Sequence, residues 1–294
     1  MIAYGAHLPL IGPARTLSEL RDYARRAHAA GFSHLCVNDH LLFQRPWLDG
    51  PTALAATLDA AGDMTLATTV ALPVVRGPVA TAKLLGALAV LSEGRLLAGV
   101  GPGSSERDYA AAGIPFEQRW GRFEESVLAL RALLTPGAPP FDGRYYSTSG
   151  LELEPRPARC PPIWLASWGS QAGMRRVARL GDGWLASGYN TTPDAFRERT
   201  SALPELPNGI ATMWLHITDT PERTIADVLA PMLGRPAEAV RELCLPIGTP
   251  EQCAEAISAY TSAGAQRIFL WPLADEARQL ERFAESVMPL VEVP

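Results

Sequence analysis

One unit of the chain, Leu84–Gly103, reads LLGALAVLSEGRLLAGVGPG. Its first half is an apolar run that ends at Ser92-Glu93-Gly94, and a glycine is typical of the position just after a helix. Its second half contains Leu96–Val100, a short apolar run of strand character, and a glycine-rich turn follows. The stretch therefore predicts a helix, a tight turn and a buried strand, which together form the repeating unit of α/β proteins.

The same alternation recurs on both sides of this unit. Strands are expected at Ile2–Leu8, His34–Asn38, Met64–Leu72, Leu96–Val100, Ile163–Ala166, Trp184–Ala186, Ile210–Ile217 and Arg267–Trp271. Two capping-box patterns, Thr16 with Glu19 and Thr249 with Gln252, mark the beginnings of helices between them. Eight strand–helix repeats in a chain of 294 residues predict an α/β fold, specifically a closed (β/α)8 TIM barrel.

Residues 135–162 interrupt this rhythm. The segment is rich in proline, and Asp142-Gly143 is typical of a hairpin turn. We therefore expect an insertion segment, not a linker between two domains. One domain would then cover residues 1–294.

Composition narrows the class of protein. The net charge is −5 and the basic residues are scattered, so the sequence predicts no nucleic-acid surface. No apolar run approaches the roughly 20 residues that cross a bilayer. The four cysteines form no CxxC pair, which fits a reducing compartment. We expect a cytoplasmic protein that does not enter a membrane.

Polar residues stand where the predicted strands end, which is where barrels of this class place their functional groups. These positions include His7, Asn38-Asp39-His40, Thr69, Gly101 and Ser167–Ser170. His40 is the first candidate for proton transfer, because imidazole exchanges a proton near neutral pH and Asp39 is adjacent. Neighbouring strand residues point in opposite directions, so Asp39 need not contact His40. The alternative for His40 is a packing or surface histidine.

The segment Trp168-Gly169-Ser170 follows a strand and begins a helix. Free N–H groups at such a helix start, beside small residues, can bind a phosphate. The alternative is an ordinary Ser or Gly N-cap. Gly99–Ser104 is a poor dinucleotide motif, because Ser104 replaces the third glycine and the run follows the fourth strand.

Five of the seven tryptophans lie within or next to the last four predicted strands. Wide apolar walls with few polar groups suit a planar aromatic ligand. The alternative is that these tryptophans fill the barrel and its rim.

Several separate stretches carry a resemblance to a known family. Leu84–Gly103 resembles the Ser-x-Gly-Arg helix end and Gly-x-Gly strand end of luciferase-like monooxygenases and their deazaflavin-dependent relatives. The resemblance continues through Ala111–Leu134, Phe141–Tyr146 and Pro161–Trp184, in the same order along the chain. It implies a barrel that binds FMN or the deazaflavin coenzyme F420, with the ring across the strand ends.

The resemblance also implies roles for individual residues. The phosphate would bind at Ser167, Trp168, Gly169 and Ser170, and the ring would contact His7, Asn38, Thr69, Val70 and Gly101. A bulge with a non-proline cis peptide is expected near Thr69–Val70. Asn38-Asp39-His40 is similar to the motif of deazaflavin-dependent relatives, in which the histidine meets the reactive ring edge, so His40 and Asp39 are the predicted catalytic residues.

The leading hypothesis is a coenzyme F420-dependent oxidoreductase that transfers a hydride between the deazaflavin and a small organic substrate. The alternative is an FMN-dependent monooxygenase that uses O2 and reduced flavin from a partner reductase. Ser104 stands where sugar-phosphate dehydrogenases of the family carry Glu, so their substrate is not carried over. A metal-dependent hydrolase is disfavoured because the chain has no HxH or HExxH, and no metal is expected. A non-catalytic flavin-binding protein also stays open, and a homodimer is expected.

Overall fold

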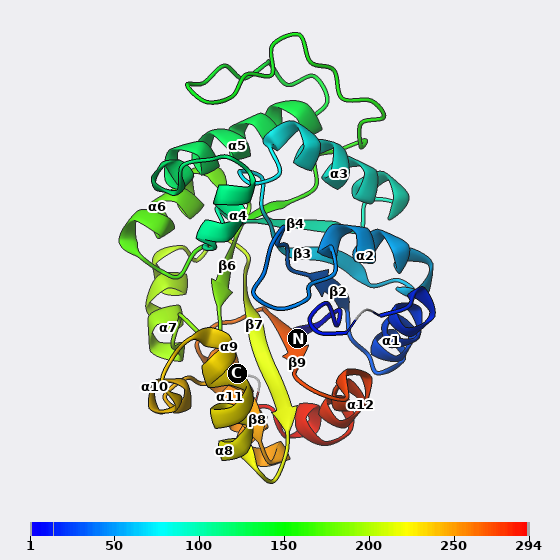
Figure 1. Ribbon diagram of the computed structural model, residues 1–294, viewed down its shortest axis with the longest axis vertical. Helices are drawn as coiled ribbons and strands as arrows, with labels where there is room; N and C mark the ends of the chain where they lie inside the picture. Colours follow the sequence, from blue (N-terminus) through cyan, green and yellow to red (C-terminus); the bar gives the residue numbers. More distant parts are fainter. Residues whose placement is uncertain (1, 14, 293–294) are drawn as a thin grey trace.

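Eight parallel strands close into a barrel in the computed structural model, which describes residues 2–13 and 15–292 (Figure 1). The strands are β1 (Ala3–His7), β2 (His34–Val37), β3 (Thr65–Ala71), β4 (Leu96–Val100), β5 (Ile163–Ala166), β6 (Gly183–Ser187), β7 (Asn208–Ile217) and β9 (Arg267–Pro272). Each strand from β1 to β6 pairs with the next, β6 pairs with β7, β7 with β9, and β9 with β1. The predicted barrel is confirmed, and the ends of its strands lie within two residues of the predicted ones.

Helices surround the barrel (Figure 1). They are α1 (Leu17–Ala29), α2 (Gly50–Ala56), α3 (Pro78–Leu91), α4 (Glu106–Ala111), α5 (Arg119–Leu134), α6 (Gln171–Leu180), α7 (Pro193–Ala202), α8 (Pro221–Thr224), α9 (Ala230–Leu233), α10 (Ala237–Arg241), α11 (Pro250–Ser262) and α12 (Glu276–Arg282). Short 3₁₀ segments lie at Leu58–Ala60, Phe116–Gln118 and Met288–Leu290, and π-helical segments at Ile225–Leu229 and Phe283–Val287. None of the helices in the described ranges has the length and apolar character that crossing a membrane requires.

Local sequence signals explain several helix starts. The side chains of Thr16 and Thr249 accept hydrogen bonds from the N–H groups of Glu19 and Gln252, and both predicted capping boxes are present. Helix α3 begins at Pro78, directly after Gly77, as the proline preference for the first helical turn predicts.

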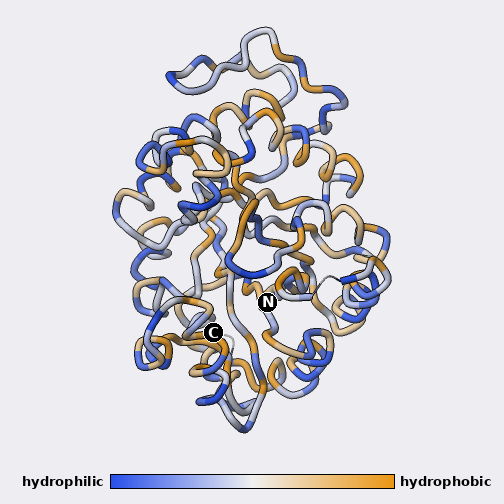
Figure 2. Tube along the Cα trace, in the orientation of Figure 1, coloured by the Kyte–Doolittle hydropathy of each residue, from blue (hydrophilic) through white to orange (hydrophobic). Residues whose placement is uncertain are grey.

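The barrel interior is filled by one side chain from each of seven strands. These side chains are Cys36, Ala67, Leu97, Trp164, Leu185, Ala211 and Phe269. Strand β1 contributes Gly5, where an added Cβ would lie 2.4 Å from the ring of Phe269, so only glycine leaves room for that ring. A second, larger core lies between the strands and the helices, and Figure 2 shows hydrophobic residues along the central strands and hydrophilic ones on outer turns.

Two long connections depart from the regular repeat. Residues 135–162, predicted as an insertion, extend beyond α3 and α5 in Figure 1, and an antiparallel bridge joins Asp142 to Ser147 at the predicted hairpin. Residues 218–246 hold α8, α9 and α10, three short helices that the sequence reasoning did not predict, and they lead to β8 (Ile247–Gly248), which extends the sheet beside β7.

Candidate functional site

The C-terminal ends of the parallel strands bring the predicted site residues to one end of the barrel, called here the mouth. His7 ends β1, Asn38-Asp39-His40 follow β2, Thr69 and Val70 lie in β3, Gly101 follows β4, and Ser167–Ser170 follow β5. Residues at these positions pair in parallel register, for example His7 with Cys36 and Val37 with Thr68. The structure therefore places them at one end of the barrel, while their binding of a cofactor stays a prediction.

His40 is held by a carboxylate. Its Nδ1 lies 2.7 Å from Oδ2 of Asp108, which is 1% exposed, and Oδ1 of Asp108 accepts hydrogen bonds from the N–H groups of Leu41 and Leu42 at 3.0 and 2.7 Å. Burial alone would raise the pKa of Asp108, but the hydrogen bonds from His40 and from the backbone keep that pKa below its usual range. An ionised Asp108 can only accept, so Nδ1 of His40 carries a proton and Nε2 is left as the basic atom.

The sequence reasoning missed Asp108, which lies 68 positions after His40. A readable signal existed, because Ser105 accepts from the N–H of Asp108 and caps α4, so that Ser105-Glu106-Arg107-Asp108 marks a helix start at the mouth.

Asp39 binds a different partner. Its carboxylate accepts from Nε and Nη2 of Arg76 at 2.8 and 2.6 Å and from the N–H of Leu72 at 3.1 Å. Arg76 also donates to Asp49, and the two carboxylates raise the pKa of this guanidinium. Asp39 therefore ties the β2 end to the β3 end, and its predicted part in catalysis remains untested.

His7 is fully engaged within the protein. Its Nδ1 lies 2.7 Å from the carbonyl oxygen of Leu8, its Nε2 accepts from the N–H of Asn38 at 2.9 Å, and its ring stacks on Trp271 with centroids 3.5 Å apart. Burial lowers the pKa of His7 to about 3, so the ring is neutral near pH 7. His7 therefore fixes Asn38 and has no free nitrogen for proton transfer.

Strand β3 carries the bulge that the resemblance implied. The Thr69–Val70 peptide is cis, and the β3–β4 register shifts between Thr68 and Ala71. The hydroxyl of Thr69 donates to Oδ1 of Asn38 at 3.0 Å. An added Cβ at Gly101 would lie 2.8 Å from Cγ2 of Val70, so Gly101 leaves room for the bulge.

The loop after β5 contains the serine N-cap that the sequence offered as one alternative, while its binding of a phosphate stays a prediction. Ser170 caps α6, because its hydroxyl accepts from the N–H of Gly173 at 3.1 Å. The N–H groups of Gln171 and Ala172 find no acceptor within the described ranges, which leaves two donors for an anion. Gly169 has a φ of +86°, and Trp168 is 57% exposed at the rim.

Aromatic side chains surround His40. Its ring centroid lies 4.7 Å from those of Phe43 and Trp47, and Trp47 lies edge-on to Trp271 at 5.6 Å. Trp271 and Trp214, which pair in register on β9 and β7, stack at 4.3 Å. Trp271 and Trp214 are among the five tryptophans that the sequence analysis placed within or next to the last four strands, but it missed Phe43 and Trp47, which reach the site from a loop.

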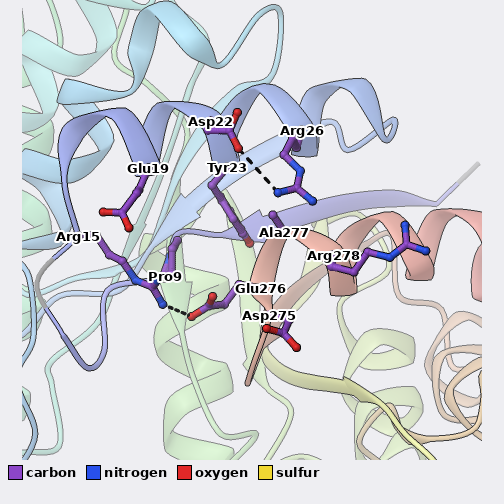
Figure 3. A pocket seen from close by; sticks show the side chains of 10 residues that line it. All are labelled: Pro9, Arg15, Glu19, Asp22, Tyr23, Arg26, Asp275, Glu276, Ala277 and Arg278. Atoms are coloured by element: carbon purple, nitrogen blue, oxygen red, sulfur yellow. Dashed lines mark hydrogen bonds and ion pairs between the residues drawn. The ribbon is translucent and has the colours of Figure 1, made fainter.

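A separate cavity of about 290 Å³ lies between α1 and α12, beside the β1 end of the mouth (Figure 3). Ion pairs line it, including Arg15 with Glu276 at 2.7 Å and Arg26 with Asp22 at 3.7 Å. Tyr23, also on its wall, donates to the carbonyl oxygen of His7 at 2.7 Å. Among the described residues no group of three or more His, Cys, Asp or Glu side chains is arranged to hold a metal ion.

Comparisons with known proteins agree on one family. The family model described as luciferase-like monooxygenase matches residues 2–206. An F420-dependent glucose-6-phosphate dehydrogenase of Intrasporangium calvum is 34% identical over 183 residues, which are 58% of this chain. The match spans about half of that relative, 53% of its length. An enzyme of the same description from Amycolatopsis mediterranei is 25% identical over 98% of this chain and 97% of its own.

Among solved structures, an F420-dependent secondary alcohol dehydrogenase in complex with an F420-acetone adduct superimposes with a TM-score of 0.83. The superposition covers 99% of each chain at 17% sequence identity. At that identity the likeness establishes the shared barrel fold and nothing about the substrate.

Proposed function

This chain belongs to the luciferase-like monooxygenase family, and we propose that it is an oxidoreductase that uses coenzyme F420 to transfer a hydride to or from a small organic substrate. The observation that carries the proposal is the His40–Asp108 pair at the mouth, beside the β3 bulge. The sequence relatives that use F420 favour this cofactor over FMN.

The residues at the mouth fit a flat cofactor with a phosphate. Gly101 lets the Val70 side chain of the β3 bulge lie against the end of β4, and the N–H groups of Gln171 and Ala172 are available to an anion at the α6 start. We propose that His7, Asn38, Thr69, Val70 and Gly101 hold the ring and that Ser167–Ser170 hold the phosphate. When bound, the deazaflavin would supply hydride chemistry at C5.

The protein supplies proton transfer and orientation. Nε2 of His40 accepts the hydroxyl proton of an alcohol substrate, or returns it in the reverse direction. Asp108 fixes the tautomer and the orientation of His40 through the bond to Nδ1. Asp39 acts as a positioning residue, because its carboxylate joins Arg76 and the Leu72 N–H.

The proposal extends to the location, the oligomeric state and the redox partner of the protein. We expect the protein to act in the cytoplasm, as a homodimer, and to draw on a separate reductase that regenerates its cofactor. The FMN-dependent monooxygenase, with reduced flavin and O2, is the competing hypothesis.

Titration of the purified protein with F420 and with FMN separates the two. We expect F420 to bind with a micromolar dissociation constant, measured by the quenching of cofactor fluorescence. FMN should bind more weakly. Tight FMN binding without F420 binding would replace the proposal by the competing hypothesis.

Variants of the pair test the mechanism. His40→Ala should lower kcat by about 10²–10⁴-fold, because the proton acceptor is lost, and should leave F420 binding intact. Asp108→Asn should lower kcat and shift its pH profile. His28→Ala, a histidine on the surface of α1 that pairs with Asp63, is the matched control. Unchanged turnover of His40→Ala would remove His40 from the mechanism.

A further inference from the structure

His40 lies on the loop that joins β2 to α2, residues 38–49, called here the His40 loop (Figure 1). Asp108 binds this loop near its start, through Nδ1 of His40 and through the N–H groups of the two residues that follow. These three bonds orient the imidazole. They do not fix the places where the loop leaves β2 and enters α2.

The second half of the His40 loop pairs with the stretch after β1. The N–H of Gly12 donates to the carbonyl oxygen of Pro46 at 3.0 Å, and the N–H of Leu48 donates to that of Leu10 at 2.9 Å. An ordered path of the loop over the β1 end is the result, with Trp47 beside His40.

One guanidinium joins the two ends of the His40 loop. Nε and Nη2 of Arg76 donate to the carboxylate of Asp39 at 2.8 and 2.6 Å, and Nη2 also donates to Asp49, the last residue of the loop. The Arg76 side chain is 18% exposed and that of Asp39 is 2% exposed, so the contact is largely shielded from water. Arg76 therefore closes the loop as the shared partner of both ends.

The turn after the β3 bulge places Arg76. Strand β3 ends at Ala71, the N–H of Arg76 donates to the carbonyl oxygen of Leu72 at 3.0 Å, and α3 begins two residues later. The N–H of Leu72 itself donates to Asp39 at 3.1 Å. The same short turn thus binds the first end of the His40 loop twice, through its backbone and through Arg76.

The charges of this contact depend on one another. Burial alone would raise the pKa of Asp49, but hydrogen bonds from Thr52 and Arg76 keep that pKa below its usual range. The hydrogen bond to Asp39 raises the pKa of Arg76. An isolated surface ion pair contributes little to stability, whereas a guanidinium shared between two carboxylates and partly buried contributes more. Without Arg76, the Asp39 and Asp49 carboxylates would lose the cation between them.

We propose that Arg76 is a positioning residue: by joining Asp39 to Asp49 it closes the His40 loop and holds the imidazole of His40 on Asp108. The inference rests on the proposed function, in which His40 exchanges the proton. It adds a part for Arg76 and Asp49, and it places His40 before any ligand binds, because every contact of the closure lies within the protein.

Asp49→Asn opens the closure with the least disturbance, because asparagine also caps a helix and Arg76 keeps Asp39. Proton NMR of the ring N–H groups gives the readout, with the Nδ1–H of His40 assigned by its absence in His40→Ala. We expect exchange of this proton with water to be about tenfold faster in Asp49→Asn, the value of one hydrogen bond between charged groups. Asp59→Asn, which removes the exposed pair with Arg21, is the matched control and should leave the exchange unchanged.

Cleavage by chymotrypsin gives a second readout. Leu41 and Leu42 are 41% and 48% exposed, so local opening of the His40 loop offers a cleavage site that mass spectrometry can locate. We expect cleavage at residues 41–43 to be about tenfold faster in Asp49→Asn and in Arg76→Gln, with an unchanged melting temperature for Asp49→Asn. In the F420-loaded protein, Asp49→Asn should lower kcat for 2-propanol and leave the affinity for F420 intact.

Unchanged proton exchange and unchanged cleavage in both variants would overturn the role of Arg76. A lower melting temperature of Asp49→Asn, with cleavage throughout the chain, would also overturn it, because the contact would then stabilise the whole fold and not the His40 loop. Neither readout needs a cofactor. Absence of F420 binding by the unaltered protein would therefore refute the proposed function, while proton exchange and cleavage still decide whether Arg76 closes the loop.

Discussion

His7 and His40 both stand at strand ends, yet their surroundings give them different chemistry. His7 is stacked on Trp271 with both ring nitrogens engaged, whereas His40 keeps Nε2 available because Asp108 binds only Nδ1. The sequence could rank His40 first, since it lies next to Asp39 in a motif similar to that of known relatives. It could not indicate that Asp39 binds Arg76, because the partner of a side chain depends on which loops meet in space.

The buried histidines predict a loss of stability in acid. Burial lowers the pKa of His7 to about 3, and burial together with the charge of Arg267 lowers that of His34 to about 4, against roughly 6.5 in an unfolded chain. The unfolded state therefore binds protons first as the pH falls below about 6.5, and the free energy of unfolding decreases. His7 alone should account for about 2 kcal/mol between pH 7 and pH 5.

Urea unfolding at these two pH values measures the effect. His7→Gln should reduce the difference between pH 7 and pH 5 by about 2 kcal/mol, since glutamine does not titrate. Ser262→Ala on the exposed side of α11 changes no titratable group and should leave the difference as it is. An equal pH dependence in His7→Gln and the unaltered protein would show that folding does not lower the pKa of His7.

At the scale of elements, the bulge in β3 and the turn after β4 are built to fit each other. Gly101 donates its N–H to the carbonyl oxygen of Ala71 and leaves room for the side chain of Val70. The position of the bulge followed from the resemblance, not from periodicity, because a one-residue irregularity does not change an apolar run. The structure confirms the cis peptide at Thr69–Val70.

Two glycine substitutions distinguish an effect on the contact between Gly101 and Val70 from an effect on the stability of the whole protein. Gly101→Ala would bring a methyl group to 2.8 Å from Cγ2 of Val70, so we expect at least tenfold weaker F420 binding, measured by fluorescence titration. Gly86→Ala in α3 meets only ordinary contacts, at 3.4 Å and beyond, and should stabilise the helix by about 0.5–1 kcal/mol. If the two variants bound F420 with equal affinity, the β3 bulge would have no part in cofactor binding.

Helices that the sequence reasoning missed had weaker signals. Helix α7 begins at Pro193, and the hydroxyl of Thr192 caps it, so a start signal was present without a clear apolar period behind it. The helices between β7 and β8 have four or five residues each, too short to show a period of 3.6.

At the scale of the molecule, closure of the barrel makes the two halves of the chain interdependent. The interior cluster takes Cys36, Ala67 and Leu97 from the first half and Trp164, Leu185, Ala211 and Phe269 from the second. Strand β1 pairs with β9, and β4 with β5, so both edges of the first four strands are covered by the second half. The prediction of one domain over residues 1–294 is consistent with this sharing and stays a prediction.

A fragment that ends at residue 134 should therefore not fold alone. Its interior would lack four of the seven cluster side chains, and β1 and β4 would be open edges prone to association. Circular dichroism and size-exclusion chromatography should show aggregation or little structure, and mixing with residues 135–294 should restore a folded complex. A monomeric fragment with cooperative unfolding would contradict the prediction.

The sequence by itself determined the order of the eight barrel strands, the helices with clear caps or apolar periods, the barrel and the family, because these depend on local periodicity, on caps and on motifs that are contiguous in the chain. Only the tertiary structure decided that Asp108 holds His40, that Asp39 belongs to Arg76, and that Trp47 joins Trp214 and Trp271 in one wall. These contacts join loops that are far apart in sequence. Their partners are set by where barrel closure brings each loop, which no local pattern encodes.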